Sequence, residues 1–512
     1  MMNNNNTYEH IPQEKFEFVQ LNSRLHDKKL ETKSRSFLQD ALIRFKKNKS
    51  SVFAFWILAF LLLYSIVAPL VSPYSVDDKD KLFVNYPAYV PAIAEKGWGI
   101  LDGAKVHANQ NENAMNSWKG IAMETGMDPV IRTVSAESYW VKVRGQEVEK
   151  FIYDLEVNRY FEKGIEYWTM TYDEYERLQN WQTEQGIQVI YPWVDPNEVG
   201  ADVPDADLWY KTDAKGAAKL DREGNFQPVY CTRSEVEGAP YHSTRIEGDD
   251  GSYIYSFATS GSVKVRLCYY NYYIYLNGTE PTYLMGTTAN GMDLFSAIGY
   301  GARFSLIFAI LVSAVNLTVG AVYGAIQGYY GGRVDMYMDR FSDILSGVPM
   351  IVVITLFQLH LGDDMSPVGA FLLAFIVTGW IGMAALTRKQ FYRFKSQEFV
   401  MAARTLGASD KRLMFKHIFP NAIGTIITSV ALIIPGVIGS ETSMTYLGIV
   451  NLEDLAGTTI GTLLSQGQGT FVQAPHTMLW PSVFMGLLMI SFNLFGNDLR
   501  DAFNPTTRGA GD

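Results

Sequence analysis

The stretch EFVMAARTLGASDKRLMFKHIFPN, residues 398–421, separates two long uncharged segments of the chain. Its small residues, single internal glycine and cluster of bases predict two short helices joined by a turn, which we call the elbow. Ser396 suits the N-cap of the first helix, and Gly407 suits its end. The second helix is expected at 410–418, where Pro420 ends it. Its basic side chains predict that the elbow lies at the headgroup layer of a membrane.

Six segments are apolar enough to cross a bilayer, since each holds about 18 or more uncharged, mainly apolar residues. One such segment alone is also compatible with a buried core helix, but six together indicate a polytopic membrane protein. The first is interpreted as an anchor that is not cleaved, because no small-residue cleavage site follows it. The predicted spans are 52–71, 304–327, 344–361, 368–386, 422–439 and 478–495.

The charges predict how these spans are oriented. Residues 75–290 hold about 33 acidic and about 20 basic side chains, whereas the rest of the chain is net positive. Basic loops prefer the cytoplasmic side. The bases at 44–49, 333–340 and 388–417 all fall on that side if the N-terminus is inside. We therefore expect a multi-pass protein of the cell membrane with both termini cytoplasmic and the acidic block extracellular.

The predicted fold is an all-α polytopic membrane protein with six transmembrane helices and a large inserted extracellular α+β domain. The expected parts are a cytoplasmic N-terminal segment at 1–50, the first transmembrane helix at 51–72, the inserted domain at 75–285, a five-helix membrane domain at 294–501 and a cytoplasmic tail at 502–512.

The acidic block is expected to fold, because it is rich in tryptophan, tyrosine and β-branched residues. A helix is predicted at 171–185. The stretch SVKVRLCYYNYYIYL, residues 262–276, opens with strand-like alternation that places Lys264 and Arg266 on one face. Asn277 and Gly278 then predict a hairpin or turn.

Both cysteines of the chain, Cys231 and Cys268, lie in this block. An extracellular compartment permits a disulfide between them. The alternative is a pair of buried thiols that act as small apolar side chains.

The elbow carries a resemblance to a known family. The pattern Ala402-Ala403-x-x-x-Gly407, followed by His417-x-x-Pro420-Asn421, resembles the EAA loop of bacterial ABC-importer permeases. The sequence of this stretch is similar to that of the C-type subunits of the oligopeptide, dipeptide and nickel branch, although Met401 replaces the glutamate that gives the loop its name. The matching positions are Glu398, Ala402, Ala403, Arg404, Gly407, His417, Pro420 and Asn421.

Other stretches agree with this resemblance. They are GYYGGRVDMYMDRFSDILSGVP at 328–349, ETSMTYLGI at 441–449 and FNLFGNDLRDAFNP at 492–505, together with LMGTTANGMDLFSAIGYGARFSL at 284–306, where Thr288 and Met292 depart from the pattern. The resemblance covers a little under half of the chain, and it leaves out the acidic block.

The resemblance implies the type I ABC-importer permease fold. It also implies a permease subunit of an ATP-driven oligopeptide importer, in which residues 398–421 couple to cytosolic ATPases. The implied partners are a B-type permease subunit, two ATPase subunits that carry ATP and magnesium, an extracellular peptide-binding lipoprotein and membrane lipids. No cofactor bound by this chain and no nucleic-acid partner is expected.

Polar and helix-bending residues inside the spans are candidates for the translocation path or its gate. The alternative for each polar residue is a hydrogen bond between or within helices. The candidates are Asn316, Thr428, Ser429, Pro435, Ser440 and Glu441.

The sequence lacks the motifs of several enzyme classes. It has no Gly-x-x-x-x-Gly-Lys-Ser/Thr phosphate loop, no His-Glu-x-x-His and no Cys-x-x-Cys, so the chain is not expected to be an enzyme. Two other functions stay open: the same machinery for dipeptides, nickel chelates or opines, and, more distantly, a membrane-anchored surface receptor. A receptor needs only one anchor, whereas six spans with a basic inner loop favour transport.

Overall fold

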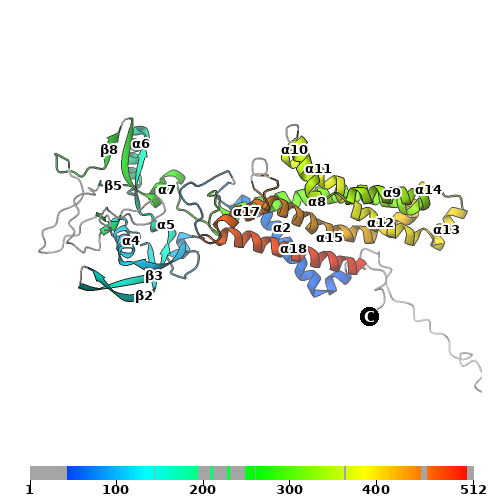
Figure 1. Cartoon of the computed structure of the whole chain (residues 1–512), viewed down its shortest axis with the longest axis horizontal. Helices are drawn as coiled ribbons and strands as arrows, with labels where there is room; N and C mark the ends of the chain where they lie inside the picture. The colour runs from blue at the N-terminus through cyan, green and yellow to red at the C-terminus, as the bar shows by residue number, and fades with distance from the viewer. Residues whose placement is uncertain are drawn as a thin grey trace, which may run out of the picture.

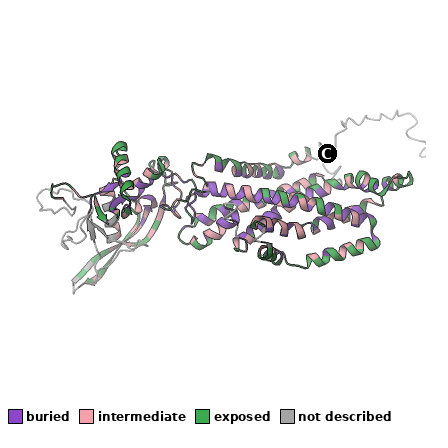
Figure 2. Cartoon of the chain, turned by 90° about the horizontal axis from the view of Figure 1, so that it is seen from above, coloured by how far each residue is buried: buried purple, intermediate pink, exposed green. Residues whose placement is uncertain are grey.

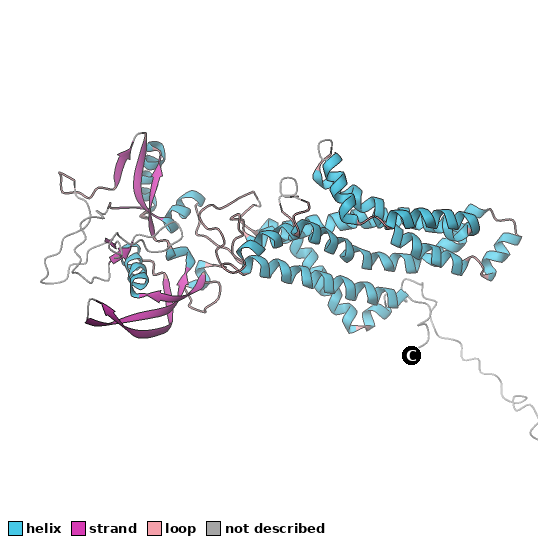
Figure 3. Cartoon of the chain, viewed as in Figure 1, coloured by secondary structure: helices cyan, strands magenta, loops and turns pink. Residues whose placement is uncertain are grey.

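The computed structural model describes residues 43–503 apart from 76, 144–145, 194–207, 211–227, 231–247, 260, 362–364, 451 and 453–457. The molecule is elongated. A bundle of helices forms one end, and the described strands gather in a separate domain at the other end (Figures 1 and 3). We call these two parts the bundle and the outer domain.

The bundle is built from long apolar helices and a few short ones. In chain order these are α2 (Lys49–Val71), α8 (Leu294–Tyr330), α9 (Gly332–Ser346), α10 (Met350–Leu361), α11 (Pro367–Gly379), α12 (Ile381–Phe394), α13 (Glu398–Thr405), α14 (Asp410–Arg412), the π-helical turn η2 (Leu413–Ile418), α15 (Phe419–Tyr446), α17 (Ile460–Thr470) and α18 (His476–Phe503).

Five helical stretches among the described residues are long and apolar enough to cross a membrane: Lys49–Val71, Leu294–Tyr330, Pro367–Phe394, Asp410–Tyr446 and His476–Phe503. A sixth exists only if α9 and α10 form one span, and these two helices bend by 73° at their junction. The predicted single span at 344–361 is therefore wrong in shape. Pro349 cannot continue the ladder of α9, and α10 alone, with 12 residues, is only about 18 Å long.

Close packing of α8 against α12 organises the bundle. Gly320, Gly324 and Gly328 lie one turn apart on α8 and face the backbone of α12. A Cβ at Gly320 would lie 2.6 Å from the carbonyl oxygen of Trp380, and one at Gly328 would lie 2.7 Å from that of Arg388. Small residues at such positions let two membrane helices approach closely. Many residues of the bundle helices are exposed (Figure 2), and these include large apolar side chains such as Phe53, Trp56 and Ile307, as expected for a surface that faces lipid.

The outer domain mixes strands with short helices, which confirms the predicted α+β class. Its elements are α3 (Pro91–Ala94), β1 (Ala104–Asn111), α4 (Glu112–Thr125), β2 (Val130–Val143), β3 (Gln146–Asn158), α5 (Arg159–Glu162), β4 (Ile165–Met170), α6 (Tyr172–Gln185), β5 (Ile190–Tyr191), β6 (Leu208–Tyr210), β7 (Pro228–Tyr230), β8 (Ser256–Thr259), β9 (Ser262–Cys268) and α7 (Tyr269–Asn277). One antiparallel sheet has the order β1-β3-β2, and a second has the order β4-β9-β5 with β8 also paired to β9; β6 pairs with β7.

The stretch 262–276 departs from the prediction at two points. Only its first half forms a strand, β9, and the second half forms the helix α7. Gly278, with φ +71°, ends that helix and does not form a hairpin turn. Lys264 is exposed as expected, but Arg266 is 2% exposed. It lies inside because its guanidinium forms a two-pronged ion pair with the buried carboxylate of Glu124, with Nη2–Oε2 at 2.9 Å. The predicted helix at 171–185 is confirmed, with Thr171 as its N-cap.

Cys268 is a free, fully buried cysteine in the core of the outer domain. Burial raises the pKa of its thiol to about 11, which makes the thiol inert at neutral pH. Cys231, the other half of the predicted disulfide, lies outside the described residues.

Two segments, residues 72–90 and 279–293, connect the outer domain to the bundle, and we call them the stem. Tyr89 and Tyr283 exchange two backbone hydrogen bonds of 2.8 Å. Asp293 caps α8 and accepts a hydrogen bond of 2.8 Å from the Ser72 hydroxyl. Burial raises the pKa of Asp80 and of Asp293, while hydrogen bonds to each carboxylate oppose the rise. The stem is thus a joint in which the two segments pair with each other and bury Tyr89, Tyr283 and Asp293.

Candidate coupling elbow and translocation path

The first helix of the elbow, α13, begins at Glu398. The residue before it is Gln397, whose carbonyl accepts hydrogen bonds from the N–H groups of Val400 and Met401. The predicted N-cap at Ser396 is therefore wrong by one residue. The chain is still extended at Gln397, with φ −73° and ψ 151°, and turns into the helix only after it.

Gly407 ends this helix as predicted, in the left-handed conformation with φ +82°. Ala408 N–H donates to the carbonyl of Ala403 at 3.1 Å, and Gly407 N–H donates to that of Arg404 at 3.0 Å. This pair of bonds is a Schellman motif. A Cβ at Gly407 would meet nothing within 4 Å, so the backbone conformation, and not lack of space, requires glycine here.

The second helix does not end at Pro420, which corrects the prediction. Ser409 caps α14 by accepting from Arg412 N–H at 3.4 Å, and the helix then continues without interruption from Asp410 to Tyr446. Pro420 is accommodated because η2 precedes it. In that wide turn Phe419 N–H donates to the carbonyl of Met414, five residues back. The hydrogen bonds of the helix are therefore already shifted from the usual i to i−4 pattern before Pro420.

The elbow is held against the ends of α8 and α12. Val400, Leu413 and Ile418 are fully buried in one apolar cluster with Phe391 of α12 and Tyr329 of α8. The Tyr329 hydroxyl also donates to Asp410 at 2.5 Å and receives a longer bond of 3.5 Å from Arg404. Tyr329 therefore joins both halves of the elbow to α8.

The opposite face of the elbow is exposed. Large apolar side chains are Phe399, Met401 and Leu406, of which Leu406 is 88% exposed. Glu398 and Ala402 lie on the same exposed helix. The elbow occupies the end of the bundle opposite the outer domain (Figure 1). An exposed apolar surface at that position is suited to contact another protein.

The remaining elbow residues lie at the transition into the span. His417 is half-buried, and its carbonyl accepts from the Asn421 side chain at 2.7 Å. Pro420 and Asn421 are exposed, and Ala403 is half-buried.

An ion cluster beside the elbow was missed by sequence reasoning. Arg388 of α12 bonds two carboxylates of α9: Asp335 at 2.6 Å and Asp339 at 2.9 Å. Gln327 of α8 donates to Asp339 at 3.1 Å, and Tyr392 donates to Asp335 at 2.6 Å. The i, i+4 spacing of the two aspartates on one helix was the available signal. The cluster ties α8, α9 and α12 together next to the elbow.

Two of the polar path candidates form hydrogen bonds within their own helix, and a third is buried. The hydroxyls of Thr428 and Ser429 both bond to the carbonyl of Thr425 in their own helix, at 3.1 and 2.8 Å. Asn316 is 2% exposed and packs against Gly379 of α11, and its Oδ1 has no partner among the described residues. Asn316 and Thr428 are buried and Ser429 is half-buried in this conformation.

Glu441 lies inside the bundle and not at its outer surface. The side chain is fully buried, and one oxygen accepts from the Ser305 hydroxyl of α8 at 2.8 Å. It therefore links α15 to α8. Pro435 is buried within α15, which continues through it, and Ser440 is half-buried on the same helix.

Comparison with known proteins decides the family. A model described as the inner membrane component of binding-protein-dependent transport systems matches residues 320–509, and a model of the N-terminal transmembrane domain of oligopeptide transport permease C matches residues 36–88. The oligopeptide transport system permease protein OppC of Bacillus subtilis is 37% identical over 46% of this chain and 76% of its own length. The chain belongs to this family of inner-membrane permeases.

Further permeases agree. The dipeptide transport system permease protein DppC of Bacillus subtilis is 34% identical over 44% of this chain and 68% of its own length. The OppC protein of Haemophilus influenzae is 35% identical over 45% of this chain and 72% of its own length. Neither family model covers residues 89–319, which include most of the outer domain.

Family membership makes the chain a multi-pass permease component of an ABC transporter. ATP hydrolysis takes place in partner ATPases, and the family works with binding proteins. Within the described part of the permease, no group of three or more histidine, cysteine, aspartate or glutamate side chains is arranged to hold a metal ion.

Proposed function

We propose that the chain is the C-type permease subunit of an ATP-driven importer of oligopeptides. In this proposal it pairs with a B-type permease and forms half of the translocation path. Two cytosolic ATPases, which carry ATP and magnesium, drive it, and an extracellular peptide-binding lipoprotein delivers the cargo. The peptide permeases among its relatives support the cargo class. In this proposal both termini are cytoplasmic and the outer domain is extracellular, because this orientation places the basic loops on the inner side of the membrane.

The observation that carries the mechanism is the shape of the elbow. Its apolar face is exposed for a partner, while its other face is fixed to α8, α12 and the start of α15. Closure of the ATPase dimer moves α13. The Schellman turn at Gly407 passes that movement to the continuous helix Asp410–Tyr446, and Tyr329 passes it to α8. A partner can shift the permease between inward-facing and outward-facing states only by contacting the two states differently.

Substitutions at Gly407 test this assignment. Gly407→Pro fixes φ near −65° and removes the bond from Gly407 N–H to Arg404. We expect it to reduce peptide uptake at least about tenfold and to release the ATPases during purification. Gly407→Asn is the matched control, because asparagine tolerates the left-handed conformation and its side chain has room here. Retained uptake and retained ATPases in Gly407→Pro would refute the coupling role.

The cargo is tested separately. Uptake of labelled peptides of graded length, measured in cells that express the complete importer, should be saturable and should favour peptides over nickel chelates and opines. Preference for dipeptides alone would assign the chain to the dipeptide branch and leave the elbow mechanism intact.

A further inference from the structure

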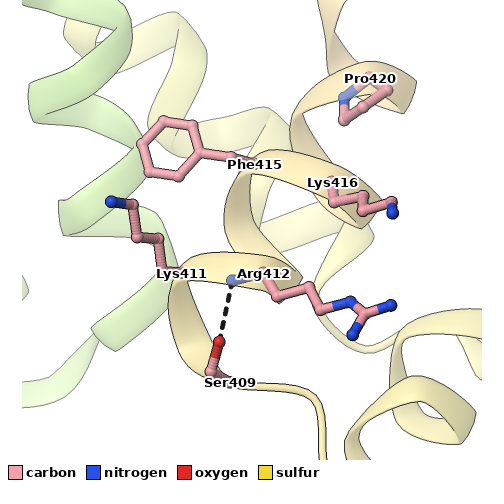
Figure 4. A pocket seen from close by; sticks show the side chains of 6 residues that line it. All are labelled: Ser409, Lys411, Arg412, Phe415, Lys416 and Pro420. Atoms are coloured by element: carbon pink, nitrogen blue, oxygen red, sulfur yellow. Dashed lines mark hydrogen bonds between the residues drawn. The ribbon is translucent and has the colours of Figure 1, made fainter.

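A basic cleft lies on the second half of the elbow, between Ser409 and Pro420. It has a volume of about 470 Å³ and is lined by Ser409, Lys411, Arg412, Phe415, Lys416 and Pro420. Figure 4 shows the Phe415 ring on the same side of the helix as Lys411, while Arg412 and Lys416 extend together on the other side. Three cations within two turns of one helix create a strong local positive potential.

These three cations lack acidic partners among the described residues. At the same end of the bundle, Arg388 bonds Asp335 and Asp339, and Arg404 bonds the Tyr329 hydroxyl. Lys411, Arg412 and Lys416 are exposed and form no ion pair there. The cleft is therefore suited to an anion.

An apolar groove begins where the basic cleft ends. It has a volume of about 260 Å³ and shares Phe415 with the cleft. Its other walls come from α8 and α15, including Leu317, Val322, Ile423 and Ile427. Along the axis of α8, Leu317 and Val322 lie about 12–20 Å from the end of the helix at Tyr330. The groove therefore runs from the elbow toward the middle of the span.

We propose that this composite site binds an anionic phospholipid. The phosphate lies among Lys411, Arg412 and Lys416, and one acyl chain lies in the groove beyond Phe415. Two features favour a lipid over a soluble partner. The groove lies between two membrane-spanning helices, Leu294–Tyr330 and Asp410–Tyr446, at a depth that a soluble protein does not reach. Basic clefts beside spans attract anionic headgroups through the charge of the leaflet. The proposal does not depend on the cargo of the permease.

The test uses the full chain, purified in neutral detergent, and phosphatidylglycerol as the probe. Binding is measured by native mass spectrometry and by titration with a fluorescent phosphatidylglycerol. The variant Lys411→Gln/Arg412→Gln/Lys416→Gln should weaken binding on the order of 100-fold, since each base near a charged leaflet contributes about a factor of five to ten. The matched control, Arg333→Gln/Lys389→Gln/Arg393→Gln, removes the same charge at the same end of the bundle and should change binding less than about threefold.

A second variant tests the groove. Val322→Trp fills the groove from α8, where Val322 is 44% exposed, and leaves the bases unchanged. It should weaken long-chain phosphatidylglycerol and leave binding of inorganic phosphate as it was. Three outcomes overturn the proposal: equal loss in the control triple variant, binding of inorganic phosphate as tight as that of the lipid, or unchanged lipid binding by the Lys411→Gln/Arg412→Gln/Lys416→Gln variant. If lipid binding is unchanged and the same variant loses the ATPases when the complete importer is purified, the cleft is a protein contact.

Discussion

At the scale of single residues, Arg388 shows how a few polar contacts position a coupling surface. The two terminal nitrogens of its planar guanidinium each donate a hydrogen bond to a different carboxylate of α9. Without it, Asp335 and Asp339 would repel each other one turn apart. The three groups are between 13% and 44% exposed, so solvent screens part of their attraction. The geometry, more than the energy, makes this contact specific for arginine.

Arg388→Gln should therefore lower the free energy of unfolding by about 1–3 kcal/mol and reduce uptake, because both carboxylates lose their positively charged partner. The stability and uptake of Arg388→Lys should lie between those of Arg388→Gln and the parent, since an ammonium group cannot bond both carboxylates through a planar fork of donors. The measurement is thermal unfolding of the purified chain together with uptake per molecule. Arg340→Gln is the control: Arg340 is 78% exposed, pairs with Asp343 at 3.5 Å, and should change stability by less than about 0.5 kcal/mol. Equal melting of the Arg388→Gln and Arg340→Gln variants would contradict this account.

At the scale of elements, the contact between α8 and α12 is set by backbone proximity. Gly324→Ala adds one carbon that overlaps the Ala384 carbonyl, so the two helices must separate. We expect a loss of about 1–3 kcal/mol of unfolding free energy, and a lower yield of folded protein. Gly382→Ala, on α12, meets nothing within 4 Å and should be neutral or stabilising by up to about 1 kcal/mol. Melting temperatures of the two variants in the same detergent decide the matter, and a Gly324→Ala chain as stable as Gly382→Ala would show that the helices are not in close contact.

Sequence patterns predicted the elements that face lipid far better than the elements that do not. Apolar runs are a local property, so the existence of the main spans and the turn at Gly407 followed from the sequence. The prediction divided the helix Asp410–Tyr446 into a short basic helix and a separate apolar span, because hydropathy detects only the part that lies in hydrocarbon. The tyrosine-rich helix α7 was assigned to a strand, since its aromatic side chains fit a core in either conformation. Contacts between distant residues, such as Arg388 with Asp335, leave only weak local signals.

At the scale of the whole molecule, the outer domain extends away from the bundle in a β-ribbon formed by β2 and β3 (Figure 2). The strand β1 pairs with β3 only as far as Ile152, so residues 138–151 of β2 and β3 pair with each other alone. Trp140 in this ribbon is 64% exposed, whereas Leu155 at its base is fully buried. A two-stranded ribbon in water is marginally stable. If the proposed function is right, we expect the peptide-binding lipoprotein to dock on this ribbon.

Trimming the ribbon tests that partner without disturbing the core. Residues 138–151 are replaced by Asn-Gly, which joins Glu137 to Ile152, two residues that already lie opposite each other. We expect unchanged thermal stability and ATPase retention, but at least about tenfold weaker binding of the lipoprotein and a matching fall in peptide uptake. Trp140→Ala should show part of this loss, and Trp98→Ala, an equally exposed tryptophan elsewhere in the outer domain, should show none. Full lipoprotein binding and full uptake by the trimmed chain would exclude the ribbon as the docking surface. Docking would then have to be sought on the rest of the outer domain.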